Sequence, residues 1–195
     1  MSDIICVTNR ALCTDDFLQR LTRIAQAAPA AILLREKDLP EEEYKQLAAS
    51  VLAICRKYHV PCILHSFVNA AIQLGHDSIH LPLPLLRQMS PEQKAQFSVI
   101  GASCHSSSDA KEAEKLGCTY ITAGHVFVTD CKKGLPPRGL AFLQEVCESV
   151  SIPVYAIGGI DADNVSEVRA AGAKGACVMS GLMCCADPQQ YLNQF

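Results

Sequence analysis

The chain has 195 residues, of which 49% are hydrophobic and 19% charged, and its formal net charge is -3. This length fits one domain, and the composition excludes a disordered chain. The slightly acidic balance argues against general attraction to nucleic acid or to an anionic membrane surface.

Short β-rich apolar runs recur along the whole chain, separated by longer stretches of helical periodicity. The apolar runs have the length and composition of strands buried on both faces. In chain order they predict strands at Asp3–Thr8, Ala30–Leu34, Cys62–His65, Ser78–Leu81, Ser98–Ala102, Cys118–Ala123, Val154–Ile157 and Gly175–Met179.

The periodic stretches between these runs predict helices. They lie at Asp15–Ala27, Glu41–Tyr58, Val68–Leu74, Pro84–Gln93, Ser107–Leu116, Leu140–Ser149, Asn164–Ala171 and Pro188–Asn193. Strands that alternate with helices form parallel βαβ units. We therefore predict an α/β fold, a single (β/α)8 TIM barrel over residues 1–195, with an open doubly wound sheet as the alternative.

Polar residues and glycines follow nearly every predicted strand, which is where barrel enzymes place their active sites. After the seventh strand come Gly158 and Gly159, whose lack of side chains lets backbone N–H groups approach an anion closely. Ser180 follows the eighth strand and offers a second set of donors. The loops after strands seven and eight often bind phosphate in this fold. The alternative is that the glycines only form tight turns.

The second predicted strand ends in the charged triplet Arg35-Glu36-Lys37. Two cations around one carboxylate, placed directly after an apolar strand, favour a ligand contact. A solvated charge cluster, or a simple pair between Glu36 and one cation, is the alternative.

The longest strand-to-helix loop follows the sixth strand and contains His125. Long loops in compact domains are usually functional, and a histidine titrates near neutral pH and can act as acid or base. The alternative is a hydrogen-bonded loop histidine without a catalytic role.

Five segments together resemble the thiamine-phosphate synthase and TenI superfamily. They are Leu34–Leu39, Gly101–Ser106, Gly124–Gly134, Ala156–Ile160 and Val178–Gly181. The resemblance extends from Leu33 to about Pro188 and implies a thiamine-phosphate-synthase-like barrel.

The chain departs from the synthase pattern where that pattern has magnesium ligands. Synthases carry Asn-Asp after the third strand, where this chain has His65-Ser66. A second aspartate follows the fourth strand in synthases, whereas here no carboxylate precedes Glu92. Magnesium prefers hard oxygen ligands, usually carboxylates. We therefore expect no metal site and no cofactor.

The Gly124–Gly134 segment looks like that of TenI-type thiazole tautomerases. This resemblance implies an isomerase that aromatises a carboxylated thiazoline phosphate by metal-free proton transfer. His125 would be the catalytic acid and base, alone or relayed through Glu36, and His105 is a further candidate for sharing that transfer. General acid–base help of this kind contributes roughly 10²–10⁴-fold.

The same resemblance implies a set of substrate-binding residues. Lys37 and Arg35 would hold the substrate carboxylate or balance developing negative charge. Gly158, Gly159 and Ser180 would hold the phosphate, and Lys132 would close over the ligand. The set is completed by Ser103, Thr129 and Met179.

Two other functions remain open at this point. The first is a thiamine-phosphate synthase with a degenerate metal site, which predicts magnesium-dependent joining of a thiazole phosphate and a pyrimidine pyrophosphate. The second is a non-catalytic regulatory or ligand-binding protein of the TenI kind. No clustered Lys/Arg recognition helix supports nucleic-acid binding.

The remaining expectations concern location and partners. No apolar run approaches the roughly 20 residues of a membrane span, and the N-terminus lacks a secretory signal pattern. The 11 cysteines include no C-x-x-C pair, so we expect free thiols in a reducing cytoplasm. Cys104 and Cys131 lie near the proposed site. We expect a small phosphorylated thiazole as ligand and neither nucleic acid nor membrane as partner, and the family resemblance suggests a homodimer.

Overall fold

A computed structural model describes residues 2–195. Its eight strands follow one another around a closed barrel in sequence order, which confirms the predicted (β/α)8 architecture. The strands are β1 (Ile4–Val7), β2 (Ala31–Leu34), β3 (Cys62–His65), β4 (Ser78–Pro82), β5 (Val99–Cys104), β6 (Tyr120–Gly124), β7 (Val154–Ile157) and β8 (Gly175–Val178).

Most helices fall between the strands, as the periodicity predicts. The helices are α1 (Phe17–Gln26), α2 (Glu41–Lys57), α3 (Val68–Gln73), α4 (Leu83–Gln88), α5 (Pro91–Lys94), α6 (Ser107–Lys115), α7 (Gly139–Ser149), α8 (Val165–Ala170), α9 (Ser180–Cys184) and α10 (Pro188–Leu192). The last two follow β8, and the helix over Ser180–Cys184 is not predicted from the sequence. Two short 3-10 helices, η1 (Arg10–Leu12) and η2 (Asp130–Lys132), lie in loops after strands.

The single helix predicted over Pro84–Gln93 is wrong, because the chain forms α4 and α5 there. The break falls at Met89 and Ser90. The residue before a proline is disfavoured in helical conformation, so Pro91 prevents α4 from continuing. Ser90 instead starts α5 with a capping box, in which its hydroxyl accepts from Gln93 N–H and the Gln93 side chain accepts from Ser90 N–H.

The described chain forms two compact units. The first runs up to Ile79 and includes Gln96–Ser98 and Val178–Phe195, whereas the second comprises His80–Ala95 and Val99–Cys177. Each has its own apolar core. In the first, Leu21 and Ile24 of α1 are fully buried beside strand residues such as Ile32, and in the second the buried residues include Ile121 and Leu143.

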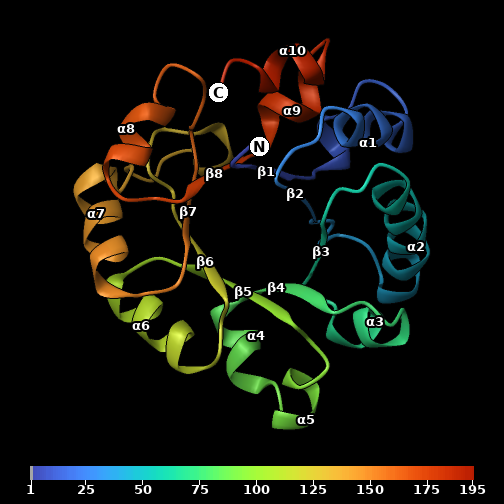
Figure 1. The fold of residues 1–195 in the computed structure, drawn as a ribbon, viewed down its shortest axis with the longest axis horizontal. Helices are drawn as coiled ribbons and strands as arrows, with labels where there is room; N and C mark the ends of the chain where they lie inside the picture. Colours follow the sequence, from blue (N-terminus) through green and yellow to red (C-terminus); the bar gives the residue numbers. More distant parts are fainter. Residues whose placement is uncertain (1) are drawn as a thin grey trace. The chain divides into compact units, whose positions relative to one another are not determined.

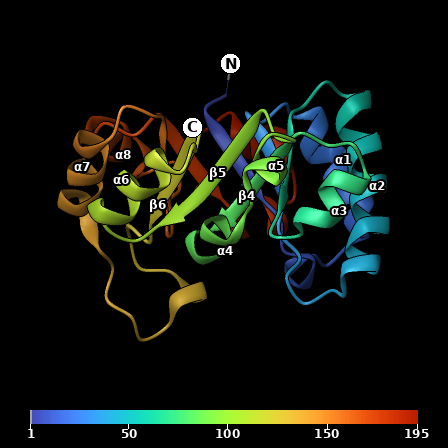
Figure 2. The same cartoon turned by 90° about the horizontal axis from the view of Figure 1, so that it is seen from below.

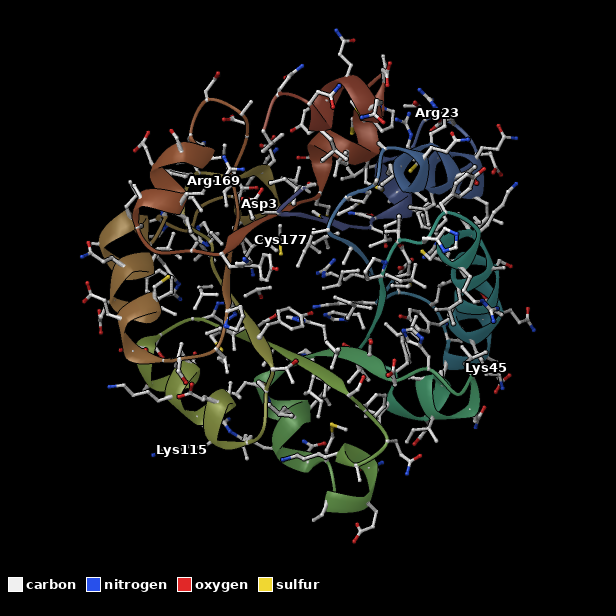
Figure 3. The ribbon with its side chains drawn as sticks, in the orientation of Figure 1. Asp3, Arg23, Lys45, Lys115, Arg169 and Cys177 are labelled. Carbon is white, nitrogen blue, oxygen red and sulfur yellow. The ribbon has the colours of Figure 1, made fainter. Side chains whose placement is uncertain are left out.

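Parallel strand pairing inside each unit brings the strand ends into register. In the first unit Cys6 lies opposite Ile32, and in the second Ser103 lies opposite Thr122. Figure 1 shows α1 and α2 on the outer side of β1–β3 in the first unit, and α6 and α7 on the outer side of β6 and β7 in the second. In Figure 3 the Lys115 side chain projects outward from the end of α6. Within residues 2–195, no helix has the length and apolar character that a membrane crossing requires.

Candidate active site

In the first unit, the predicted residue Glu36 lies directly after β2 and is almost fully buried. Its Oε1 accepts a 2.6 Å hydrogen bond from the Thr8 hydroxyl and a 3.1 Å bond from Arg10 N–H. Its Oε2 forms an ion pair with Arg10 Nη1 at 3.3 Å. The Thr8 oxygen in turn accepts from Arg35 N–H at 2.9 Å. The carboxylate therefore ties the exits of β1 and β2 together.

Arg10 also binds Asp38, which is exposed. Their hydrogen bond lowers the pKa of the Asp38 carboxyl and raises the pKa of the Arg10 guanidinium. The sequence shows polar residues after the first strand but does not indicate that Arg10 pairs with two acids of the next loop. The two cations that flank Glu36 differ in exposure, since Arg35 is half-buried and Lys37 is exposed.

The end of β3 carries a second hydrogen-bonded group. The Tyr44 hydroxyl donates to the Leu34 carbonyl and accepts from His65 N–H, both at 2.8 Å. Ser66 Oγ lies 2.7 Å from His65 Nδ1, and Ser66 has a φ of 67°. A left-handed φ is uncommon outside glycine. The His65 and Ser66 side chains thus bind one another at the exit of this strand.

The segment around β8 supplies the last two predicted residues of this unit. Met179 is half-buried and directly precedes α9, whose first residue is the exposed Ser180. Gly181 is packed against the Tyr191 ring, because a Cβ at position 181 would lie 2.0 Å from the Tyr191 hydroxyl.

In the second unit, the loop after β6 follows the exit of β7 before it turns away. Val126 N–H donates to the Ile157 carbonyl and Phe127 N–H to the Gly158 carbonyl, both at 3.0 Å. Figure 2 shows the loop, with η2 in it, extending well beyond the end of β6. Residues 125–127 therefore pack directly against the Gly158–Gly159 turn.

The packed loop leaves no space for side chains on the two glycines. Gly158 and Gly159 have φ values of 102° and 68°. A Cβ at 158 would lie 2.3 Å from His125 Cβ, and one at 159 would lie 2.3 Å from the Val128 carbonyl oxygen. Both positive φ and close approach require glycine. The carbonyls of both residues are engaged, that of Gly158 by Phe127 N–H and that of Gly159 by the Asn164 side chain.

His125 and His105 contact backbone carbonyls of the same unit. The half-buried His125 places Nε2 at 3.4 Å from the Leu135 carbonyl. His105 Nδ1 lies 2.9 Å from the Gly124 carbonyl. The His125 imidazole therefore contacts the long loop itself, and the His105 imidazole contacts the end of β6, where that loop begins.

Thr129 and Lys132 lie at the two ends of η2. The Thr129 hydroxyl caps this short helix by accepting from Cys131 N–H at 3.4 Å, whereas Lys132 is exposed. Ser103 of β5 is half-buried and contacts His80 of β4 at 2.9 Å. The second unit thus holds the glycine turn and five other candidate residues, which are Ser103, His105, His125, Thr129 and Lys132. The first unit holds the other predicted residues.

The cysteines in this unit allow a first prediction. Cys104 is fully buried, and burial raises the pKa of its thiol to about 12, whereas Cys131 is exposed. We expect iodoacetamide at pH 8 to alkylate Cys131 at least about 100-fold faster than Cys104, because the thiolate is the reacting form. Peptide mass spectrometry of native and urea-unfolded protein measures both rates. Equal rates in the native protein would contradict this placement of Cys104.

Comparison with known proteins identifies the family. The pattern described as "Thiamine monophosphate synthase" matches residues 4–182. The thiamine-phosphate synthase of Syntrophomonas wolfei is 32% identical over 93% of this chain and 88% of its own length. Thiamine-phosphate synthase 2 of Streptococcus pneumoniae is 30% identical over 97% of this chain and 91% of its own length. The chain belongs to the thiamine monophosphate synthase family.

A solved structure of this family agrees over almost the whole chain. Thiamine phosphate pyrophosphorylase from Pyrococcus furiosus superposes with a TM-score of 0.84 at 30% identity, and it covers 98% of this chain and 92% of its own. A 3-hexulose-6-phosphate synthase superposes with a TM-score of 0.70 at 16% identity, which shows a shared fold alone.

These relatives overturn the tautomerase prediction. That prediction depended on two positions without carboxylates and on the loop around His125. The similarity to curated synthases instead extends over most of the chain. The assignment as a metal-independent isomerase is therefore wrong, whereas the placement of His125 and Glu36 in the active site stays a prediction.

The residues at the two metal positions of the family pattern do not fit magnesium. His65 and Ser66 bind one another, and no carboxylate lies between the end of β4 and Glu92. Within residues 2–195, no three His, Cys, Asp or Glu side chains gather in a way that could hold a metal ion. Imidazole and hydroxyl groups are poor substitutes for the carboxylates that Mg²⁺ prefers.

Proposed function

We propose that this chain is a thiamine-phosphate synthase, a transferase that joins a thiazole phosphate to a pyrimidine pyrophosphate. The observation that carries the proposal is the 30–32% identity to curated thiamine-phosphate synthases over more than nine-tenths of the chain. In the reaction, the bond between the pyrimidine's carbon and the pyrophosphate oxygen breaks and a bond to the thiazole forms. The electron pair leaves with pyrophosphate.

The second unit supplies groups suited to a phosphate monoester. The turn at Gly158 and Gly159 holds both carbonyls in hydrogen bonds, and we assign its backbone N–H groups to the phosphate oxygens of the thiazole. Successive backbone N–H groups of a turn can bind an anion directly. Lys132, exposed on the long loop, adds a positive charge for the same group.

The first unit supplies the cations suited to the leaving group. Negative charge grows on pyrophosphate as its bond breaks, and fixed positive charges stabilise that change without reorganisation. Arg35 and Lys37 flank Glu36, whose bonds to Thr8 and Arg10 fix the backbone between them. In this proposal Glu36 positions the two cations and transfers no proton.

Such a reaction uses phosphorylated metabolites of the cytoplasm, where the free thiols of all 11 cysteines are stable. This is the location that we propose for the protein. A phosphorylated thiazole, expected as the ligand, becomes one of two substrates.

Removal of one cation tests the proposal. We expect Lys37→Ala to lower the rate of pyrophosphate release from the two substrates by about 10- to 100-fold, the loss typical of one charge-assisted contact to the reacting group. Lys115→Ala, which removes a lysine pointing outward from α6 (Figure 3), is the matched control and should remain within about twofold of wild type. Equal rates for the two variants would remove Lys37 from the site, and absence of release from wild type would refute the function.

A further inference from the structure

Three polar side chains form a buried chain across neighbouring strands of the second unit. His80 of β4 is buried, with Nδ1 2.9 Å from the Tyr120 hydroxyl and Nε2 2.9 Å from Ser103 Oγ. Tyr120 lies at the start of β6 and is also buried. Ser103, near the end of β5, is half-buried and forms the accessible end of the chain.

The surrounding residues are shaped for this arrangement. A Cβ at Gly101 would lie 2.2 Å from Tyr120 Cζ and 2.5 Å from His80 Nδ1, so only glycine leaves room for the contact between the two side chains. Tyr155 packs edge-on against the Tyr120 ring, with the ring centroids 5.9 Å apart. Gly101 thus leaves room for the contact between His80 and Tyr120, and Tyr155 packs against the phenol ring.

The hydrogen-bond capacity of Tyr120 decides which nitrogen of His80 carries the proton. Among residues 2–195, Tyr120 has His80 as its one hydrogen-bond partner. A buried hydroxyl proton without an acceptor is costly. The phenol satisfies its proton only by donating to Nδ1, and this places the proton of a neutral imidazole on Nε2.

We propose that Tyr120 and His80 are positioning residues that make the Ser103 hydroxyl an outward-facing hydrogen-bond donor for a phosphoryl oxygen of the substrate. The His80 Nε2–H group donates to Ser103 Oγ. The hydroxyl proton of Ser103 is therefore not needed for its contact with His80 and can be donated to a ligand. A hydroxyl held in this way selects an acceptor, and phosphate and pyrophosphate oxygens are strong acceptors. The choice of a phosphorylated ligand rests on the proposed synthase function, whereas the proton position on His80 rests on the contacts alone.

The first test is a two-bond ¹H–¹⁵N spectrum of protein labelled at histidine, which distinguishes protonated from unprotonated ring nitrogens. The His80 signal is identified by its loss in His80→Gln. We expect Nε2 to carry the proton in the wild type, and Tyr120→Phe to shift the signal toward the other tautomer. A wild-type His80 protonated on Nδ1 alone would overturn the inference.

The second test is calorimetric titration with inorganic pyrophosphate and, separately, inorganic phosphate. We expect Ser103→Ala to weaken binding of at least one of the two by about tenfold, and Tyr120→Phe to weaken the same one at least threefold. The anion affected identifies the group that Ser103 contacts. Tyr58→Phe is the matched control and should leave both affinities unchanged. Among residues 2–195, the Tyr58 hydroxyl accepts a single, exposed hydrogen bond, from Gln26.

Thermal unfolding of each variant shows that the fold is retained. Unchanged binding of both anions in Tyr120→Phe, or no binding of either anion to the wild type, would overturn the inference. If the tautomer and both affinity losses are as expected but mixed substrates give no product, the synthase proposal fails while the role of His80 and Tyr120 stands.

Discussion

Gly158→Ala is expected to destabilise the protein by about 2–5 kcal/mol and to weaken phosphate binding by about 100-fold. An alanine at a left-handed φ costs roughly 1–2 kcal/mol by itself. The new methyl group would lie 2.3 Å from His125 Cβ and 2.8 Å from His125 Cα. Because a Cα atom does not yield as a flexible side chain does, either the turn or the loop after β6 must move, and such overpacking adds about 1–3 kcal/mol.

Gly117→Ala isolates the contribution of the clash. Gly117 has a φ of 94°, close to the 102° of Gly158, but a Cβ there would have nothing within 4 Å. It should therefore show the conformational cost of about 1–2 kcal/mol alone and unchanged phosphate affinity. Urea unfolding and calorimetry of the two variants give both quantities. Equal destabilisation of the two would contradict the close packing of the long loop on the glycine turn.

Glu36→Ala is the second change with a large expected effect. The substitution leaves the buried Thr8 hydroxyl and Arg10 N–H without their acceptor and the Arg10 guanidinium without its buried carboxylate. Removing one partner of a fully buried ion pair costs about 3–5 kcal/mol. Since the Arg10 side chain retains 32% of its exposure, solvent screens part of the loss, and we expect about 2–4 kcal/mol in urea unfolding.

Asp38→Ala is the matched control on the same arginine. The Asp38 side chain is 69% exposed, and exposed ion pairs contribute about 0–1 kcal/mol. We expect a change within that range and a synthase rate near that of wild type, whereas Glu36→Ala should lower the rate because the backbone between Arg35 and Lys37 loses its anchor. A loss as large in Asp38→Ala as in Glu36→Ala would place the structural role on the exposed pair.

The strand and helix order could be predicted from the sequence because each element carries its own local signal. Buried strands such as Ile4–Val7 are continuous apolar runs, and helix ends carry glycines such as Gly117. The apolar periodicity does not indicate the break between α4 and α5, although Pro91 and the Ser90 cap mark it. It continues through this short interruption and therefore predicts one longer helix.

The long-range contacts of the candidate site could not be predicted in this way. The sequence shows a glycine pair at Gly158 and Gly159, but residues 125–128, which exclude side chains there, are some 30 positions earlier. Likewise, nothing local indicates that Glu36 accepts from Thr8 and Arg10. Contacts between consecutive strand ends become visible only once the register of the barrel is known.

The tautomerase prediction is wrong because it depends on local departures from the family pattern, whereas the similarity to synthases extends along the chain. The absence of carboxylates at His65-Ser66 is real, and the structure shows these two side chains bound to one another. This absence of carboxylates concerns one subsite. The curated synthases match over most of the chain, so the change at that position alters how the site is built without changing the family.

The central claim is the joining reaction, and the mass of its product tests it most directly. The purified protein is incubated with a thiazole phosphate and a pyrimidine pyrophosphate, with and without added magnesium, and the mixtures are analysed by mass spectrometry. We predict one new species whose mass corresponds to the two substrates joined with loss of pyrophosphate, formed only when both substrates are present. Recovery of both substrates unchanged, from a folded protein that binds them, would contradict the account.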